Sequence, residues 1–322
     1  MKELGLSVNL NALRLVEELC EGADYYRVEV KEHPSGAKVI DSGIKAKGGL
    51  LAGRLITEIA LGGLGEVEVT TKSYGEGLKL PSISITTDHP AIATLGSQLA
   101  GWRVKVGGYT AIGSGPARAL ALKPKSIYRE IEYRDEADVA ILILEASEEP
   151  PDDVFGYVSD LCGVKPSNLY LIMVPTSSAA GFIQVSGRIV EVGMHKLARL
   201  GLNPLSVTYA HGYAPVMPPH PDYVEAMGRV NDAILYGGVT YYAVTGYKDE
   251  TLGDIANRSV SSVSRQYGRP FKEIFRDAGL DFYKVDPELF APAEITIYNV
   301  DTGRVFRAGG VNPKLLERSL GL

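Results

Sequence analysis

Cysteine is scarce in this chain of 322 residues, which contains only Cys20 and Cys162. The two lie far apart, so the sequence predicts neither a disulfide framework nor a cysteine-based metal site. The five histidines show no HExxH motif and no other spacing typical of metal ligands. We therefore expect no metal, with a site assembled from residues distant in the sequence as the alternative.

Long apolar runs and an excess of positive charge are missing as well. The sequence shows neither a run of about eighteen apolar residues nor a signal peptide, so we expect a cytoplasmic protein without a membrane partner. Its 39 acidic residues outnumber its 33 basic ones, which argues against a nucleic-acid partner because phosphate backbones attract basic surfaces. The glycine-rich segment 107–115 lacks the lysine of a nucleotide-binding phosphate loop.

Apolar periodicity predicts helices and strands throughout, and the pattern changes after about 135 residues. Before that point, helical segments such as 48–61 alternate with strand-like pairs. After it, the apolar run 139–144 indicates a strand covered on both faces, and strands alternate with helices as far as a long helical region over 252–278. We predict a two-domain α/β protein with a mixed α/β domain over 1–135. The second, more parallel α/β domain covers 136–322, and its closing hairpin is able to pack on the first domain.

The stretch 184–197 predicts one buried helix with a narrow polar side. At 100° per residue, four polar residues fall within an arc of roughly 60°, and these are Gln184, Arg188, Glu191 and His195. The rest of the circumference is apolar or small, as in a buried helix, and hydroxyls at 176–178 are expected to cap its start. Two interpretations of the Arg188–Glu191 pair stand side by side: a structural ion pair, or the wall of a reactive cleft.

The chain contains, in order, the stretches EIALGGLG (58–65), GSQLAGW (96–102), SGPAR (114–118), the segment 184–197, GYAP (212–215) and MGRVND (227–232). Taken together, these six stretches resemble one family, the methenyltetrahydromethanopterin cyclohydrolases of archaea and methylotrophs. The resemblance runs from about Ser7 to Arg307. It implies a two-domain α/β fold with a cleft between the domains, a homotrimer, a place in one-carbon metabolism and methanogenesis, and no metal or prosthetic group.

The resemblance also implies a reaction, the hydrolysis of 5,10-methenyltetrahydromethanopterin to the 5-formyl form. The family's catalytic arginine and glutamate lie close together on one helix, a pattern that Arg188 and Glu191 match. The bridge carbon is a cationic electrophile, so the attacking water must lose a proton. A nearby carboxylate can take that proton and stabilise the cation. We therefore expect a hydrolase in which Glu191 activates water with the help of Arg188.

Further residues are candidates for contact with the pterin carrier, each with a structural alternative. Ser114 and Arg118 lie at a predicted helix N-terminus, where they would bind the carrier's anionic tail or only form a capping turn. Ser97 and Gln98 would hydrogen-bond the amide edge of the pterin, or satisfy their own helix. The remaining candidates are Gln184, on the polar side of the predicted helix, and His195, expected to orient neighbours rather than act as a base.

Two rival functions are compatible with the same residues. One is another enzyme that uses the same carrier, although a dehydrogenase would need a dinucleotide fingerprint that the sequence lacks. The other is a pterin-binding protein without activity, for which a water-activating carboxylate would serve no purpose. Trp102, the only tryptophan, is either a core residue or a platform for ring stacking.

Overall fold

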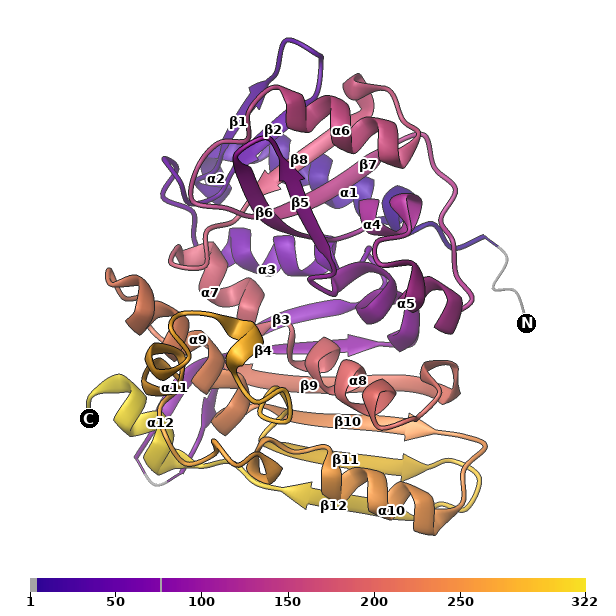
Figure 1. Ribbon diagram of the computed structural model, residues 1–322, viewed down its shortest axis with the longest axis vertical. Coiled ribbons are helices and arrows are strands. Elements are labelled where there is room, and N and C mark those ends of the chain that lie inside the picture. The colour runs from indigo at the N-terminus through magenta and orange to yellow at the C-terminus, as the bar shows by residue number, and fades with distance from the viewer. Residues whose placement is uncertain (1–4, 76) are drawn as a thin grey trace. The chain divides into compact units, whose positions relative to one another are not determined.

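The computed structural model describes residues 5–75 and 77–322, and these divide into two compact units. Unit 1 comprises Met1–Glu66 and Ala91–Gln184, and unit 2 comprises Val67–Pro90 and Val185–Leu322. Each unit is built on its own six-stranded sheet (Figure 1). This division differs from the boundary expected near residue 136, because the strands that follow that residue pair with strands that precede it. The mixed α/β class that we predicted is confirmed.

Unit 1 has a mixed sheet in the order β1-β2-β8-β7-β6-β5. Strands β2, β8 and β7 run parallel, and the hairpins at both ends add antiparallel strands. Alternate residues of β7 belong to two separate apolar clusters, Ile141 and Ile143 to one and Leu142 and Leu144 to the other. The sheet is therefore covered on both faces, as the apolar run predicted. The strands are β1 (Glu29–Glu32), β2 (Lys38–Asp41), β5 (Trp102–Val106), β6 (Tyr109–Ser114), β7 (Ala140–Glu145) and β8 (Leu169–Met173).

The helices of unit 1 bury their apolar sides against this sheet. Ser7 begins the first helix, because its hydroxyl accepts a hydrogen bond from the Leu10 amide at 3.1 Å. Residues 91–98 form a π-helix, η1, which ends with a five-residue hydrogen bond from the Leu99 amide to the Thr94 carbonyl at 2.8 Å. The α-helices are α1 (Val8–Glu21), α2 (Ala23–Tyr26), α3 (Leu50–Ala60), α4 (Ala117–Ala121), α5 (Lys125–Glu130), α6 (Asp153–Cys162) and α7 (Ala179–Ser186).

Unit 2 has a sheet in the order β12-β11-β10-β9-β4-β3. Among the pairs of described strands, β10 and β11 are parallel, whereas β9 with β10, β11 with β12 and β4 with β9 are antiparallel. The part of the second half that lies in unit 2 is thus mixed, while β7 and β8 in unit 1 are parallel as expected. Helices α8, α9 and α10 pack against this sheet (Figure 1). The elements are β3 (Glu66–Ser73), β4 (Lys79–Thr87), α8 (Ile189–Arg199), β9 (Val207–Pro215), α9 (Tyr223–Gly237), β10 (Val239–Val244), α10 (Asp249–Arg258), α11 (Phe271–Asp277), β11 (Glu294–Asn299), β12 (Val305–Gly309) and α12 (Pro313–Leu320).

Three predicted elements differ from the structure. The segment 184–197 is not one helix: α7 ends at Ser186, and α8 begins after Arg188, whose ψ of 4° is not helical. Gly187 lies at the break, where its lack of a side chain weakens a helix. The long helix over 252–278 is likewise two helices: α10 ends at Arg258, and α11 begins at Phe271, directly after Pro270, which is compatible with the start of a helix but not with its interior. The expected glycine-rich loop contains strand β6.

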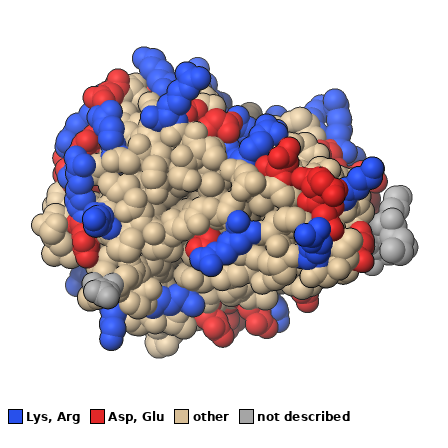
Figure 2. All heavy atoms as spheres, turned by 90° about the horizontal axis from the view of Figure 1, so that it is seen from below, with Lys and Arg blue, Asp and Glu red and all other residues tan. Residues whose placement is uncertain are grey.

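Within the described residues, no helix is long and apolar enough to cross a bilayer. Charged side chains of both signs are interspersed on the face that Figure 2 displays, with a broad area of uncharged side chains among them. That face therefore offers no extended basic surface of the kind that nucleic acids require.

Asp232 is a buried carboxyl group at the packing of the helices of unit 2. It lies on α9 and accepts hydrogen bonds from the Phe271 amide at 2.8 Å and from the Ser319 hydroxyl at 2.6 Å. The group thus joins α9 to α11 and α12. Burial raises the pKa of Asp232 from its ordinary value of 3.8 to about 7, although the two hydrogen bonds act in the opposite direction.

We expect the stability of the protein to depend on pH through Asp232. Because the pKa is higher in the folded state, the contribution to the free energy of unfolding is complete below about pH 4 and is lost as the pH rises through about 7. The free energy of unfolding of the wild type should therefore fall by up to about 4 kcal/mol relative to that of Asp232→Asn between these pH values. This corresponds to about 1.4 kcal/mol for each unit of difference in pKa. Urea unfolding of both proteins between pH 4 and 8 measures this difference, and a constant difference would contradict it.

Candidate functional site

The start of α8 carries the predicted catalytic residues. Arg188 is the N-cap residue, Glu191 lies in the first turn, and His195 follows one turn later on the same side. The Glu191 side chain is only 5% exposed, whereas Arg188 and His195 are half-buried. A helix N-terminus carries a partial positive charge, so this position stabilises a carboxylate. Arg188 and Glu191 thus both lie at the start of α8, whereas Gln184 lies on α7 rather than on this helix.

Three glycines allow α8 to pack closely against the sheet of unit 2. A Cβ atom at Gly193 would overlap the Tyr242 hydroxyl, and one at Gly238 would overlap the Ile189 side chain. At Gly212, on β9, a Cβ would come within 3.0 Å of Val190. A side chain at any of these positions would therefore push α8 away from the sheet or shift its neighbours.

Tyr242 fixes the position of the first turn of α8. Its side chain is fully buried on β10, and its hydroxyl donates a hydrogen bond to the Val190 carbonyl at 2.8 Å. Burial raises the pKa of Tyr242 well above its ordinary value, and the charge of Glu191 acts in the same direction. The hydroxyl thus keeps its proton and donates it to the carbonyl of Val190, the residue that precedes Glu191. Sequence reasoning missed Tyr242; the one available signal was Gly193, a glycine inside a helix.

A second group of predicted residues lies in unit 1, around the π-helix η1. Ser97 and Gln98 end this helix and are buried. The Ser97 hydroxyl donates to the Ala60 carbonyl at 2.6 Å, so it joins η1 to the end of α3. The structural alternative was that Ser97 hydrogen-bonds within its own helix. Its contact is structural, but the partner belongs to another helix. A π-helix is rare and is found most often at functional sites.

Arg118 is fully buried and binds backbone carbonyls of the same region. Its guanidinium donates to the carbonyls of Leu95 at 3.2 Å and Ser97 at 2.9 Å, and its Nε donates to the Lys123 carbonyl at 2.8 Å. The Ser97 carbonyl also accepts from the Gly115 amide at 2.9 Å, directly after Ser114. The structure thus brings Ser97, Ser114 and Arg118 together. This geometry supports a structural role for Arg118; its contact with an anionic tail stays a prediction.

Other candidates are placed as follows. Gln184 is buried near the end of α7, whose start is capped by the Ser178 hydroxyl, which accepts from the Gly181 amide at 3.0 Å. Trp102 lies in the apolar core of unit 1, as one of its two interpretations predicted. In residues 5–75 and 77–322, no group of three or more His, Cys, Asp or Glu side chains is arranged to hold a metal ion.

We expect Arg118→Ala to destabilise the fold. Three carbonyls would lose a charged donor in a fully buried place, which should lower the free energy of unfolding by about 2–5 kcal/mol. Urea unfolding measures this loss, with Arg129→Ala, an exposed arginine of the same unit, as the control. An unchanged free energy of unfolding would instead support the anion-binding role predicted from the sequence.

Comparison with known proteins adds the family. The protein-family model described as Cyclohydrolase (MCH) matches residues 7–320 of this chain. Among the similar proteins are those named methenyltetrahydromethanopterin cyclohydrolase from Methanothermobacter marburgensis, 47% identical, Methanocaldococcus jannaschii, 46% identical, and Methanococcoides burtonii, 42% identical. Each alignment covers 98% of this chain, and 100%, 98% and 99% of the respective relative. The chain belongs to the cyclohydrolase (MCH) family.

Proposed function

We propose that this protein hydrolyses 5,10-methenyltetrahydromethanopterin to 5-formyltetrahydromethanopterin. The observation that carries the proposal is the similarity to proteins of that name along nearly the whole chain. The buried carboxylate at the start of α8 supports it, because the reaction needs a proton acceptor close to a cationic carbon. The pterin carrier is then the small-molecule partner, and no metal or prosthetic group takes part.

In this mechanism, water attacks the bridge carbon and Glu191 accepts its proton. A new C–O bond forms, and the bond between the carbon and one of its two nitrogens breaks. One hydrogen of the water ends on the released nitrogen, the other leaves as a proton, and the carbon stays on the second nitrogen as a formyl group. The negative charge of Glu191 also attracts the cationic substrate and favours its approach.

Arg188 acts through Glu191. It is the N-cap residue of the helix whose first turn carries Glu191, and we assign it to the orientation of that carboxylate. We assign Gln98 and Gln184 to hydrogen bonds with the pterin ring and His195 to the orientation of its neighbours. The corresponding roles of Ser97 and Ser114 stay predictions, as does a cytoplasmic location.

The family resemblance also leads us to propose a homotrimer. One side of the sheet of unit 2 supports self-association, since it displays the tyrosines Tyr209, Tyr213, Tyr241 and Tyr298 at exposed or half-buried positions. Tyrosine is enriched in protein interfaces because it offers a large apolar area with few rotatable bonds.

A spectroscopic assay tests the proposed function directly. The methenyl carrier absorbs light through a conjugated system that hydrolysis interrupts, so purified protein should accelerate the loss of absorbance. Binding of the carrier without turnover would support the rival hypothesis of a non-catalytic pterin-binding protein.

Glu191→Gln should lower kcat by about 10²–10⁴-fold, or roughly 3–5 kcal/mol of barrier, because the amide keeps the size of the side chain but cannot accept the proton. KM should change only modestly. Arg188→Ala should lower kcat as well, and the double variant should be little worse than Glu191→Gln alone, because the two residues act as a unit.

The melting temperatures of the same preparations provide the control for these variants. If the pair were only structural, each single substitution would leave an uncompensated buried charge and lower the melting temperature strongly. Near wild-type kcat in well-folded Glu191→Gln would end the case for Glu191 as the base.

Treatment with a chelator should leave kcat unchanged. The bridge carbon is already an electrophile, so the reaction does not require a Lewis acid to polarise it. Turnover measured before and after dialysis against EDTA checks this expectation. A large loss of activity that a single divalent ion restores would contradict it.

A further inference from the structure

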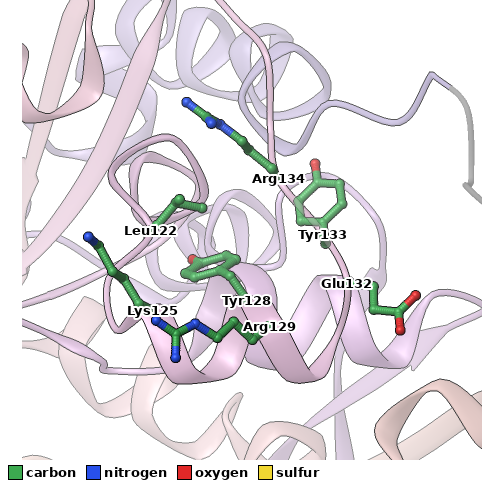
Figure 3. Close-up of a pocket in the computed structure, with 7 residues that line it drawn as sticks. All are labelled: Leu122, Lys125, Tyr128, Arg129, Glu132, Tyr133 and Arg134. Carbon is green, nitrogen blue, oxygen red and sulfur yellow. The ribbon is translucent and has the colours of Figure 1, made fainter.

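A pocket in unit 1 carries residues to which the mechanism gives no role. It has a volume of about 400 Å³ and lies along α5 and the segment that follows it (Figure 3). Four of its lining residues are charged, two are tyrosines and one is a leucine. They are Leu122, Lys125, Tyr128, Arg129, Glu132, Tyr133 and Arg134.

The pocket is positively charged on one side. Figure 3 shows the ends of Lys125, Arg129 and Arg134 on one side of the pocket and the Glu132 carboxylate directed away from them. None of the three cations forms an ion pair with any residue that the structure describes, whereas exposed Arg318 of unit 2 binds a carboxylate at 2.8 Å. Three cations that no described carboxylate neutralises, lining one pocket, attract an anion.

Two tyrosines of the pocket are hydrogen-bonded to backbone carbonyls. Tyr128 is buried, and its hydroxyl donates a hydrogen bond to the Gly96 carbonyl at 2.7 Å. Its ring lies 5.7 Å from the Arg118 guanidinium, and the Tyr133 hydroxyl donates to the Leu6 carbonyl at 2.9 Å. These contacts attach the pocket to the backbone of η1 and of the segment that precedes α1.

The same contacts connect the pocket to the candidate pterin-binding residues. Gly96, the partner of Tyr128, immediately precedes Ser97 and Gln98 on η1. A Cβ at Gly96 would come within 3.1 Å of Ile131, so η1 and the end of α5 pack without space for a side chain between them. The pocket and the end of η1 are therefore parts of one packed region of unit 1.

We propose that this pocket binds the anionic side chain of the pterin carrier, which bears phosphate and carboxylate groups. This inference rests on the proposed function. Guanidinium groups pair with phosphate and carboxylate oxygens through two parallel hydrogen bonds, and the tyrosine rings line the apolar part of the chain. Exposed Lys125, Arg129 and Arg134 are open to a ligand, whereas the cation first expected to do this, Arg118, is fully buried.

The test is a triple variant, Lys125→Gln, Arg129→Gln and Arg134→Gln. Its KM should rise about 10- to 100-fold with kcat unchanged, because the lost contacts stabilise the ground state and transition state equally. Its Kd for the carrier should rise by the same factor. A matched control removes three exposed cations elsewhere in unit 1 (Arg14→Gln, Arg103→Gln and Lys105→Gln) and should leave KM within about twofold of the wild-type value.

A truncated ligand separates the pocket from general electrostatics. A methenyl pterin without the anionic side chain should bind the wild type and the triple variant equally. The inference is overturned if the triple variant leaves KM and Kd unchanged, if the control variant raises KM as much, or if the truncated ligand loses affinity to the same extent. Should the wild type bind the carrier without hydrolysing it, the proposed function fails, and the Kd values still decide about the pocket.

Discussion

The close contact between α8 and the sheet beneath it is the constraint on which the proposed chemistry depends. A carboxylate can act as a base only if it is held to within about 0.5 Å of its productive position, at hydrogen-bonding distance from the water that it activates. Here the backbone of the first turn is held by the Tyr242 hydroxyl, and Gly193 leaves room for that hydroxyl. Position is thus set by packing against a buried strand rather than by the flexible side chain of Glu191 itself.

In unit 1, a buried side chain likewise holds backbone in position, here the backbone around Ser97. The segment around Ser97 is irregular, and irregular backbone in a core leaves carbonyl groups without the partners that a regular helix would supply. Arg118 supplies them, since one buried guanidinium binds carbonyls of η1 and of the turn after α4. A charge that would otherwise be costly to bury thereby stabilises a π-helix that hydrogen-bonding within the helix alone would not favour.

The sequence predicted those elements whose signal is local. Each of these signals is contained in a short stretch of sequence. They are the apolar run of β7, the hairpin of β11 and β12, and the capping hydroxyl of Ser178. The break at Gly187 was missed because the apolar pattern continues through it, and β6 was missed because its glycines suggested a loop. Gly113 in that strand instead lies close to the neighbouring strand, since a Cβ atom on it would be 3.1 Å from the Trp102 carbonyl oxygen.

Strand pairing between distant segments is outside the reach of such local reasoning. Residues 67–90 supply β3 and β4 to the sheet of unit 2, and β7 and β8 belong to the sheet of unit 1. No single boundary in the sequence therefore divides the chain into the two units. The candidate site shows the same limit. Glu191 and Arg188 were found because they are neighbours on one helix, whereas Tyr242 is 52 positions away from the Val190 carbonyl that it binds.

The placement of Glu191 reconciles two opposing requirements of a base. Burial strengthens the attraction between a carboxylate and a cationic carbon, but it also favours the neutral acid, which cannot accept a proton. The N-terminus of α8 adds a partial positive charge next to Glu191 whose direction is fixed, because backbone amides cannot swing into the site. A helix whose first turn is immobilised by Tyr242 keeps those amides aligned. The same contact therefore sets both the position of the carboxylate and the electrostatic field in which it works.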